Sequence, residues 1–394
     1  MTTDIVVLGL LFSEEALEFA YKYSKVGVQV APHMFQKKML EGIKNVSDVN
    51  VTLVNIPPVG SYPLKYKKMF LKDRIWEMNN IEVGYINIPF IKYLQQEKKI
   101  YSILADKVKK DKKKILHILI YSSYEPFLKA AIKIKERYKN VKICLLQTDA
   151  VPGINDMDRY MTFRNKIRGK KIIQLAKKID SFVILTKNLV EALKIGERPY
   201  SIVECICDPS QESLRKDKSE NICLYTGTTM EEYNIKDIVD SFKLINNAQL
   251  WVCGFGNMDS YIKDISNDYP NIRHFGMLKP DEVQALRDKC DFLINPRRPT
   301  GTYTKYSFPS KIAEYLMSGK PTILYKLEGI PDEYDEFLNY ITGTTPEKIA
   351  IELNKIFSLN YSSLTKKAKK ARIFVVENKN SFIQGKKIIE TLKL

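Results

Sequence analysis

Histidine and closely paired cysteine are scarce in this chain. Its 394 residues include three histidines and six cysteines. No two cysteines have a CxxC spacing, and the closest pair is Cys205 and Cys207, in a strand-like stretch. Zinc sites in proteins usually need such spacings together with nearby histidines. The sequence therefore disfavours a metal site and predicts buried, free thiols in a reducing cytosol.

Long apolar runs are missing too. The composition is that of a globular protein, 44% hydrophobic and 28% charged. No apolar run approaches the roughly 20 residues that span a bilayer. Residues 4–12 lack a basic leader and a small-residue cleavage site, so they are interpreted as a buried strand rather than a signal peptide. We expect a cytoplasmic protein, which can rest on the inner face of the membrane without crossing it.

Acidic side chains are deficient in the first half only. The net charge is +17, from 63 Lys and Arg against 46 Asp and Glu. Residues 1–200 carry 36 basic and 20 acidic side chains, whereas residues 201–394 carry 27 and 26. Lysine-rich usage in an AT-rich genome would affect both halves equally. We therefore expect the first half to meet an anionic partner: nucleic acid, an acidic membrane or a phosphorylated substrate.

The basic excess is densest in residues 157–179, where eight cations oppose only Asp158. Apolar residues recur there at spacings near three and four, which predicts an amphipathic helix. Such a helix can lie on anionic lipid, so we expect contact with an anionic membrane surface; a solvated charged face is the alternative. The cations are Arg159, Arg164, Lys166, Arg168, Lys170, Lys171, Lys177 and Lys178.

Short apolar stretches alternate with helical patterns along the whole chain. This alternation is typical of α/β proteins whose parallel sheets are covered by helices on both faces. The polar stretch 208–220 separates two halves, each large enough for a doubly wound sheet. The expected strands are 4–10, 51–57, 82–89, 114–121, 141–148, 181–186, 201–207, 221–227, 249–254, 272–276, 292–296 and 321–325.

Two glycine turns in the second half are candidate phosphate contacts. Gly227 and Thr228 follow one expected strand, and Gly254 opens a GxG motif after the next. Small residues there let backbone N–H groups approach a phosphate, although tight turning alone explains both motifs. The GxG lacks the third glycine and the acidic residue of a dinucleotide fingerprint, which disfavours an NAD enzyme.

The strongest motif begins at Phe308. Pro309 and Ser310 open an expected helix, and its free N–H groups together with Lys311 suit a diphosphate. Glu314, three residues further on, can accept hydrogen bonds from two vicinal hydroxyls of the kind a ribose presents. A helix cap followed by an ordinary surface Lys–Glu pair is the alternative.

Residues 295–334 closely resemble the nucleotide-binding region of retaining GT-B glycosyltransferases, especially those of bacterial capsule and exopolysaccharide synthesis. The resemblance covers most of residues 221–345 and is loose over residues 1–207. The family pattern Ser-Lys-x-x-Glu-Tyr-x-x-x-Gly-x-Pro is matched by Ser310, Lys311, Glu314, Tyr315, Gly319 and Pro321.

This resemblance implies the GT-B fold: two Rossmann-like, doubly wound α/β domains that face each other across a cleft. The basic domain, residues 1–207, would bind the acceptor, and residues 208–220 would be the linker. Residues 221–375 would bind the nucleotide sugar. Residues 376–394 would form a C-terminal helix that packs back on the first domain.

Site residues carry over from the family position by position. Glu314 would bind the ribose, Ser310 and Lys311 the diphosphate, and the backbone at 275–277 would frame the base. The full set of expected substrate contacts is Gly9, Leu10, Gly227, Thr228, Gly254, Phe275, Gly276, Met277, Arg297, Lys305, Tyr306, Ser307, Pro309, Ser310, Lys311 and Glu314.

Three positions depart from the family pattern. Tyr306 stands where an acidic residue often contacts the donor sugar. Thr228 and Asn234 stand where Arg and Lys commonly grip the diphosphate. We expect Arg297, Arg298 or Lys305 to supply the missing positive charge.

The resemblance further implies retaining transfer from a nucleotide sugar, with UDP favoured and no metal or other cofactor. The protein would position the reactants and stabilise charge on the departing diphosphate. Asp149, at the end of an expected strand, would orient the acceptor, or would only cap a turn. His117 lies within an apolar strand and is interpreted as a core residue. A basic first domain suits a glycan acceptor, including one carried on polyprenyl diphosphate.

Three other functions stay open at this point. A UDP-sugar 2-epimerase shares the architecture but usually needs acidic and histidine groups that have no evident counterpart here. A non-catalytic GT-B partner subunit would explain the departures from the pattern. Binding to nucleic acid rests on charge alone, with no recognised motif, and is not expected.

Overall fold

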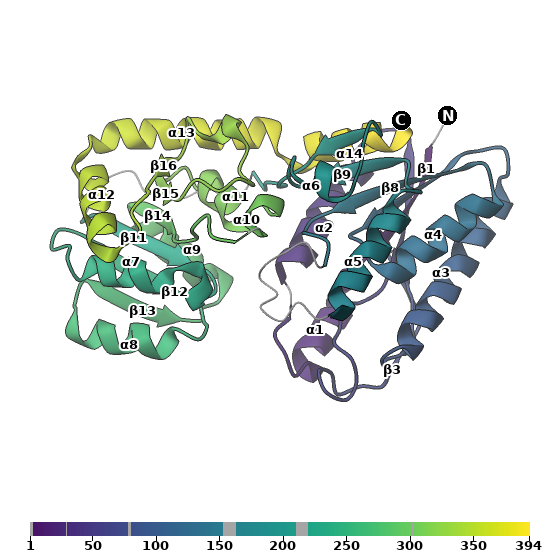
Figure 1. Ribbon diagram of the computed structural model, residues 1–394, viewed down its shortest axis with the longest axis horizontal. Coiled ribbons are helices and arrows are strands. Elements are labelled where there is room, and N and C mark those ends of the chain that lie inside the picture. The colour runs from purple at the N-terminus through teal and green to yellow at the C-terminus, as the bar shows by residue number, and fades with distance from the viewer. Residues whose placement is uncertain (1–2, 29, 78–79, 153–162, 210–219, 302) are drawn as a thin grey trace. The chain divides into compact units, whose positions relative to one another are not determined.

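The computed structural model describes residues 3–28, 30–77, 80–152, 163–209, 220–301 and 303–394 (Figure 1). The chain divides into two compact units. Unit 1 comprises Met1–Ile206 and Ser381–Leu394, and unit 2 comprises Cys207–Asn380. Each unit is built around its own, largely parallel sheet.

The sheet of unit 1 has the order β10-β9-β8-β7-β1-β2-β5-β4. All its pairs are parallel except β4 with β5. Every residue of β7 (LHILIY) is buried, because helices cover both faces. The strands are β1 (Thr3–Gly9), β2 (Val49–Asn55), β4 (Arg74–Trp76), β5 (Asn80–Glu82), β7 (Leu116–Tyr121), β8 (Val141–Gln147), β9 (Ser181–Ile184) and β10 (Tyr200–Ile202); β3 (Phe70–Leu71) and β6 (Tyr85–Ile86) form a small antiparallel pair.

One expected strand of unit 1 is wrong. The stretch 82–89 is divided between β5 and β6, which belong to different sheets. The backbone of Gly84 lies against residues 71–73, and its N–H donates to Asp73 Oδ1 over 2.8 Å. This contact draws the chain out of the main sheet. The expected strand 201–207 is also shorter than predicted, since β10 ends at Ile202.

The last helix of the chain completes the core of unit 1. In α14, Gly385 crosses α2 so closely that a Cβ on it would lie 2.3 Å from the carbonyl carbon of Gly42. The backbone oxygen of Leu392 lies 2.9 Å from His117 Nδ1. His117 is thus a buried core residue, as predicted, and burial lowers its pKa. The helices of unit 1 are α1 (Glu14–Tyr23), α2 (Val30–Lys44), α3 (Ile91–Lys110), α4 (Glu125–Arg137), α5 (Phe163–Ala176), α6 (Leu189–Ala192) and α14 (Ser381–Lys393).

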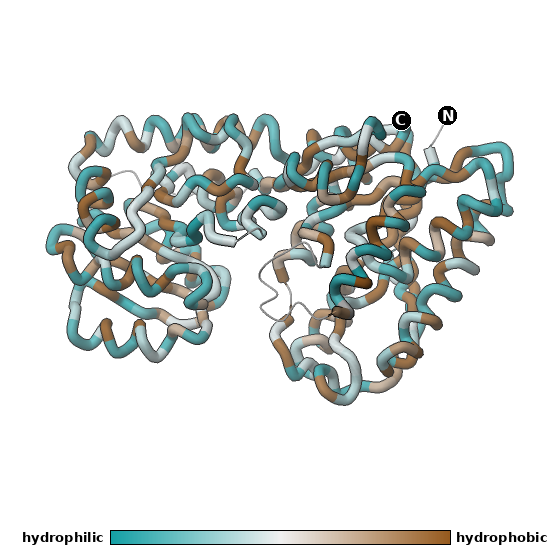
Figure 2. Tube along the Cα trace, viewed as in Figure 1, coloured by the Kyte–Doolittle hydropathy of each residue, from teal (hydrophilic) through white to brown (hydrophobic). Residues whose placement is uncertain are grey.

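The sheet of unit 2 is entirely parallel, with the order β13-β12-β11-β14-β15-β16. Figure 2 shows hydrophobic residues along its strands, whereas the surrounding helices alternate between hydrophobic and hydrophilic residues. The strands are β11 (Ile222–Thr226), β12 (Gln249–Cys253), β13 (Ile272–Gly276), β14 (Phe292–Asn295), β15 (Thr322–Leu324) and β16 (Asn339–Tyr340).

The helices of unit 2 connect these strands and end in a long helix, α13. That helix stops at Asn378 and α14 begins at Ser381, so the expected helix over 376–394 starts inside the end of α13. The helices are α7 (Ile235–Phe242), α8 (Asp259–Asp268), α9 (Pro280–Lys289), α10 (Tyr303–Tyr306), α11 (Ser310–Met317), α12 (Pro346–Ser358) and α13 (Tyr361–Asn378), with 3₁₀ turns η2 (Glu231–Tyr233) and η3 (Asp332–Tyr334).

The order of strands locates the ligand-binding edge of unit 2. Chain order runs outward from β11 in one direction and from β14 in the other, so these two neighbours form a topological switch point. In open parallel sheets, ligands bind beyond the carboxyl ends of the strands at such a point. The corresponding neighbours in unit 1 are β1 and β7.

Two general expectations can be compared with the structure. All six cysteines are buried and none forms a disulfide, as predicted. Among the described residues, no helix combines the length and the apolar character needed to cross a membrane.

Candidate functional site

Two glycine turns form one backbone cradle at the switch point of unit 2. The N–H of Gly227 donates to the Cys253 carbonyl over 3.0 Å, and the N–H of Gly254 donates to the Gly276 carbonyl over 2.8 Å. Gly254 has φ +152°, and a Cβ there would lie 1.7 Å from the Gly227 oxygen. Only glycine permits this approach. The ends of β11, β12 and β13 are therefore held together as one surface.

Helix α11 begins at the same edge of the sheet. Pro309 is its N-cap residue and makes no side-chain capping bond. The first backbone N–H groups of the helix are therefore not capped by a side chain and can donate to a ligand or to water. These groups and the helix dipole make the start of α11 suitable for an anion. Ser310 and Lys311 lie in this first turn, as the sequence predicts.

Tyr315 fixes α11 to the two strands of the switch point. Its hydroxyl accepts from the Thr226 N–H over 3.1 Å and lies 3.5 Å from the Ile294 oxygen. The side chain is fully buried, and burial raises its pKa to about 12. The hydroxyl thus stays protonated and ties the helix to β11 and β14 together.

We expect Tyr315→Phe to lower the free energy of unfolding by about 1–3 kcal/mol, since buried backbone groups lose their partner. Urea denaturation would measure the change, with the exposed Tyr21→Phe as control. If both variants unfold at the same urea concentration, the hydroxyl does not anchor α11.

Glu314 lies between two cations. Lys311 Nζ is 2.8 Å from Glu314 Oε2, and Arg287 Nη2 is 3.5 Å from the same oxygen. The Glu314 side chain is 33% exposed. Both contacts involve Oε2, and within the described part of the chain none is found for Oε1. Lys311 and Glu314 thus form the ion pair that is also common on the surface of ordinary helices. The pair leaves one carboxylate oxygen of Glu314 available to a ligand.

Arg287 is a site residue that the sequence reading missed. It belongs to α9 and is only 7% exposed. The available signal was its spacing: Val283, four residues earlier and on the same face of the helix, packs against the unit 2 core. Arg287 therefore lies on the apolar side of a charged helix, where an unpaired cation is costly.

Exposed apolar side chains follow the next two strands. Phe255, after β12, is 53% exposed, and Met277, after β13, is 68% exposed. Phe275 packs edge-on against Trp251 with ring centroids 5.6 Å apart. Gly276, between Phe275 and Met277, has φ +66°. Flat apolar groups beside open backbone can hold a planar ring such as a nucleobase.

The cations expected to replace the missing positive charge already have partners. Arg298 pairs with Asp237 over 2.9 Å, and Lys305 pairs with Glu328 over 3.1 Å. The guanidinium of Arg297 lies over the Tyr303 ring, 4.4 Å from its centroid. Tyr306 is the last residue of α10, and Ser307 follows it, bonded through Oγ to the Tyr303 carbonyl. Of the three cations, Arg297 is the one held by rings rather than by a carboxylate.

The predicted contacts of unit 1 lie at its own switch point or next to it. Gly9 ends β1, and Leu10 is held at both its N–H and its carbonyl by the buried amide of Gln36, over 2.8 and 2.6 Å. Asp149 follows β8 by two residues, is exposed, and accepts from Thr148 Oγ1 over 3.1 Å. These residues share the ligand-binding edge of the unit 1 sheet.

Part of the basic segment 157–179 lies outside the described residues, namely 157–162. Its remainder contains α5, on which Ile172 and Ala176 are buried while Ile167 is 52% exposed. The helix is amphipathic, as predicted, and its apolar face packs in unit 1.

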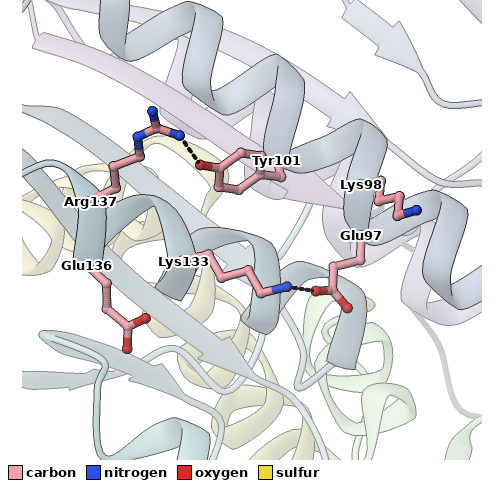
Figure 3. A pocket seen from close by; sticks show the side chains of 6 residues that line it. All are labelled: Glu97, Lys98, Tyr101, Lys133, Glu136 and Arg137. Atoms are coloured by element: carbon pink, nitrogen blue, oxygen red, sulfur yellow. Dashed lines mark hydrogen bonds and ion pairs between the residues drawn. The ribbon is translucent and has the colours of Figure 1, made fainter.

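A polar groove of about 500 Å³ runs between α3 and α4 (Figure 3). Lys133 points to Glu97, and Arg137 donates to the Tyr101 hydroxyl over 3.0 Å. Glu136 pairs with Lys178. Most of the lining side chains already have partners, so the groove offers little to a ligand.

Comparison with known proteins decides the class of unit 2. The family model described as "Glycosyl transferases group 1" matches residues 208–373. This match covers most of unit 2. The match includes both glycine turns and α11. The domain identifies the protein as a transferase, as predicted from the residues around Phe308. No curated protein sequence matches the chain significantly.

Solved glycosyltransferase structures resemble the whole chain. Sucrose-phosphate synthase from Thermosynechococcus elongatus has a TM-score of 0.64 at 11% identity, with 99% of each chain covered. Anabaena HepE in complex with UDP has a TM-score of 0.64 at 11% identity, covering 99% of this chain and 100% of that one. The lipopolysaccharide outer core galactosyltransferase WaaB has a TM-score of 0.64 at 13% identity, with 100% of each chain covered. The fold is therefore GT-B, as predicted.

Proposed function

We propose that this glycosyltransferase moves a sugar from a UDP-sugar to a glycan or lipid-linked acceptor in cell-surface polysaccharide synthesis, with retention of configuration. The observation that carries the proposal is the Lys311–Glu314 pair at the uncapped start of α11, beside the glycine cradle of Gly227 and Gly254. The UDP bound in the HepE structure supports the choice of nucleotide.

Each part of the donor has a place in this arrangement. The diphosphate lies at the first N–H groups of α11 and at Lys311, where positive charge is concentrated. The ribose hydroxyls donate to Glu314, and the base lies on the apolar edge formed by Phe255 and Met277. Arg297 is near enough to the same strand ends to approach the diphosphate, since it follows β14 by two residues.

The proposed reaction needs no side-chain nucleophile. The acceptor hydroxyl attacks the anomeric carbon on the face that the diphosphate leaves, and its proton passes to the departing phosphate oxygen. The bond from the anomeric carbon to that oxygen breaks, and the helix start together with Lys311 stabilises the negative charge that develops. The donor is the only cofactor-like group proposed, and no metal is required.

Unit 1 is proposed to bind the acceptor at the carboxyl edge of its sheet. Its excess of basic residues suits an acceptor that carries phosphate, and Asp149 is placed to orient the reacting hydroxyl. We propose that the enzyme works in the cytoplasm, resting on the anionic inner face of the membrane through residues 157–179.

A thermal-shift panel with UDP, GDP and ADP tests the donor assignment. A ligand at about 100 times its Kd stabilises the folded state by about 2.7 kcal/mol, so UDP is expected to raise the melting temperature by several degrees. GDP and ADP should raise it less. No shift with any of the three would contradict the proposed site and favour a non-catalytic subunit.

Release of free UDP separates transfer from epimerisation. With a UDP-sugar and a glycan acceptor, we expect UDP to accumulate in step with glycosylated product. Conversion of the UDP-sugar to its C2 epimer without an acceptor would overturn the transferase proposal in favour of the epimerase.

A further inference from the structure

Unit 1 contains a cavity of about 850 Å³ at the starts of α3 and α4 and along α5. Helix α4 begins at Glu125, four residues after the end of β7, so the cavity opens at the carboxyl edge of the unit 1 sheet. This is the edge at which open α/β sheets bind ligands. The volume lies in the range of small-molecule sites in proteins.

One wall of this cavity is apolar and exposed. Phe90 is 71% exposed, Leu94 is 61% exposed and Ile167 is 52% exposed. Phe90, the residue before α3, also has φ +67°, which residues other than glycine seldom adopt. Strain of this kind gathers at functional sites. The wall consists of Phe90, Tyr93, Leu94, Tyr124, Pro126 and Ile167.

Most of the remaining residues of the lining are charged, with more cations than carboxylates. Around the Glu125 carboxylate lie Lys171 at 2.8 Å, Lys129 at 3.3 Å and Arg168 at 3.9 Å. The other carboxylate of the lining, Glu97, is already paired with Lys133. Helix α4 also starts here, and its N-cap residue, Tyr124, makes no side-chain capping bond. Positive charge therefore exceeds negative charge beside the apolar wall.

A buried donor without a partner lies beside the same wall. Gln96 is 1% exposed, and its Oε1 accepts from the Tyr124 hydroxyl over 2.6 Å. Its Nε2 has no hydrogen-bond partner among the residues that the structure describes. Gln96 is not part of the cavity lining, but its bond to the Tyr124 hydroxyl fixes the Tyr124 ring in the wall.

We propose that this cavity binds the phosphorylated end of a lipid, with the diphosphate on the cationic side and the first part of the hydrocarbon chain on the apolar wall. A bare glycan would need many neutral donors and acceptors, whereas this lining offers mainly apolar and cationic groups. The inference rests on the proposed transfer to a lipid-linked acceptor and specifies where that acceptor's carrier is held.

Calorimetric titration of the full-length protein with farnesyl diphosphate, below its aggregation concentration, tests the proposal. We expect farnesyl diphosphate to bind at least tenfold more tightly than either inorganic diphosphate or farnesol, because only the whole molecule meets both sides of the cavity. Saturating UDP should not displace it. Displacement by UDP, or loss of binding in Lys311→Ala, would place the probe in the nucleotide site and overturn the proposal.

Variants of the cavity wall supply the matched comparison. Leu94→Gln and Ile167→Gln change exposed side chains, so the protein should keep its melting temperature while binding farnesyl diphosphate at least tenfold more weakly. Ile115→Gln, also exposed but outside the lining, should bind as the unmodified protein does. If all three variants bind farnesyl diphosphate equally, the proposal that it binds in this cavity is wrong. Binding to anionic phosphatidylglycerol vesicles without binding of farnesyl diphosphate would instead indicate a membrane surface.

The two proposals fail separately in this design. If UDP raises the melting temperature and is released on transfer, but farnesyl diphosphate does not bind, the transferase proposal stands and the lipid-site proposal is wrong. A protein that binds farnesyl diphosphate but shows no UDP shift loses the donor site.

Discussion

Glu314→Gln is expected to lower kcat/KM for the nucleotide-sugar donor by about 100-fold or more. A carboxylate that accepts two hydroxyl hydrogen bonds contributes about 1.5–3 kcal/mol for each, and the neutral amide keeps only part of this. The substitution also removes the anionic partner of Lys311 and Arg287, so the two cations would change position at the start of the donor site. Initial rates over a range of donor concentrations would measure the effect.

Glu336→Gln is the matched control, because Glu336 is an exposed glutamate of the same unit. Its kinetic constants should not change. An unaltered kcat/KM in Glu314→Gln, or in the double variant with Lys311→Ala, would refute the position of the nucleotide at α11. Unchanged circular dichroism in both variants would show that the loss arises in the site and not in the fold.

We expect Gly254→Ala to lower the free energy of unfolding by about 3 kcal/mol or more. The variant should also lose the increase in melting temperature that UDP causes. The new methyl group would lie 1.7 Å from the Gly227 oxygen, far inside contact distance. The two turns would have to separate, which breaks the hydrogen bonds of Gly227 and Gly254 to neighbouring strand ends. Substitutions that force overpacking against backbone give losses of this size.

Two other glycines calibrate this prediction in the same urea denaturation experiment. A Cβ on Gly27 would meet nothing within 4 Å, so Gly27→Ala should leave stability nearly unchanged. Gly276 also has open space but φ +66°, so Gly276→Ala should cost only the left-handed penalty of about 1–2 kcal/mol. If Gly254→Ala and Gly27→Ala unfold at the same urea concentration, the close contact between the two glycine turns is not needed for stability.

Much of the fold was predictable because its signals are local. Strands such as β7 and β8 are mainly apolar, and a strand buried on both faces needs no alternating pattern. The ion pair between Lys311 and Glu314 was predictable for the same reason. Lys311 and Glu314 are three residues apart, and that spacing alone places them side by side on any helix.

Other features depend on partners that are distant in the sequence. Arg287 reaches Glu314 from a different helix, and Arg298 and Lys305 are held by Asp237 and Glu328. Each of these cations resembles every other surface cation in the sequence. Their pairing follows from which loops the parallel sheet brings to one edge, and residue spacing carries no information about that.

The sequence by itself determined the alternation of strands and helices, the helix start at Pro309 and the pairing of Lys311 with Glu314, because each depends on neighbours within a few residues. Only the tertiary structure decided that Arg287 reaches Glu314 from α9, that the chain leaves the sheet at Gly84, and that an apolar wall and a cluster of cations meet at the start of α4. Those arrangements are set by packing between segments far apart along the chain, where the free energy comes from surfaces that no local pattern describes.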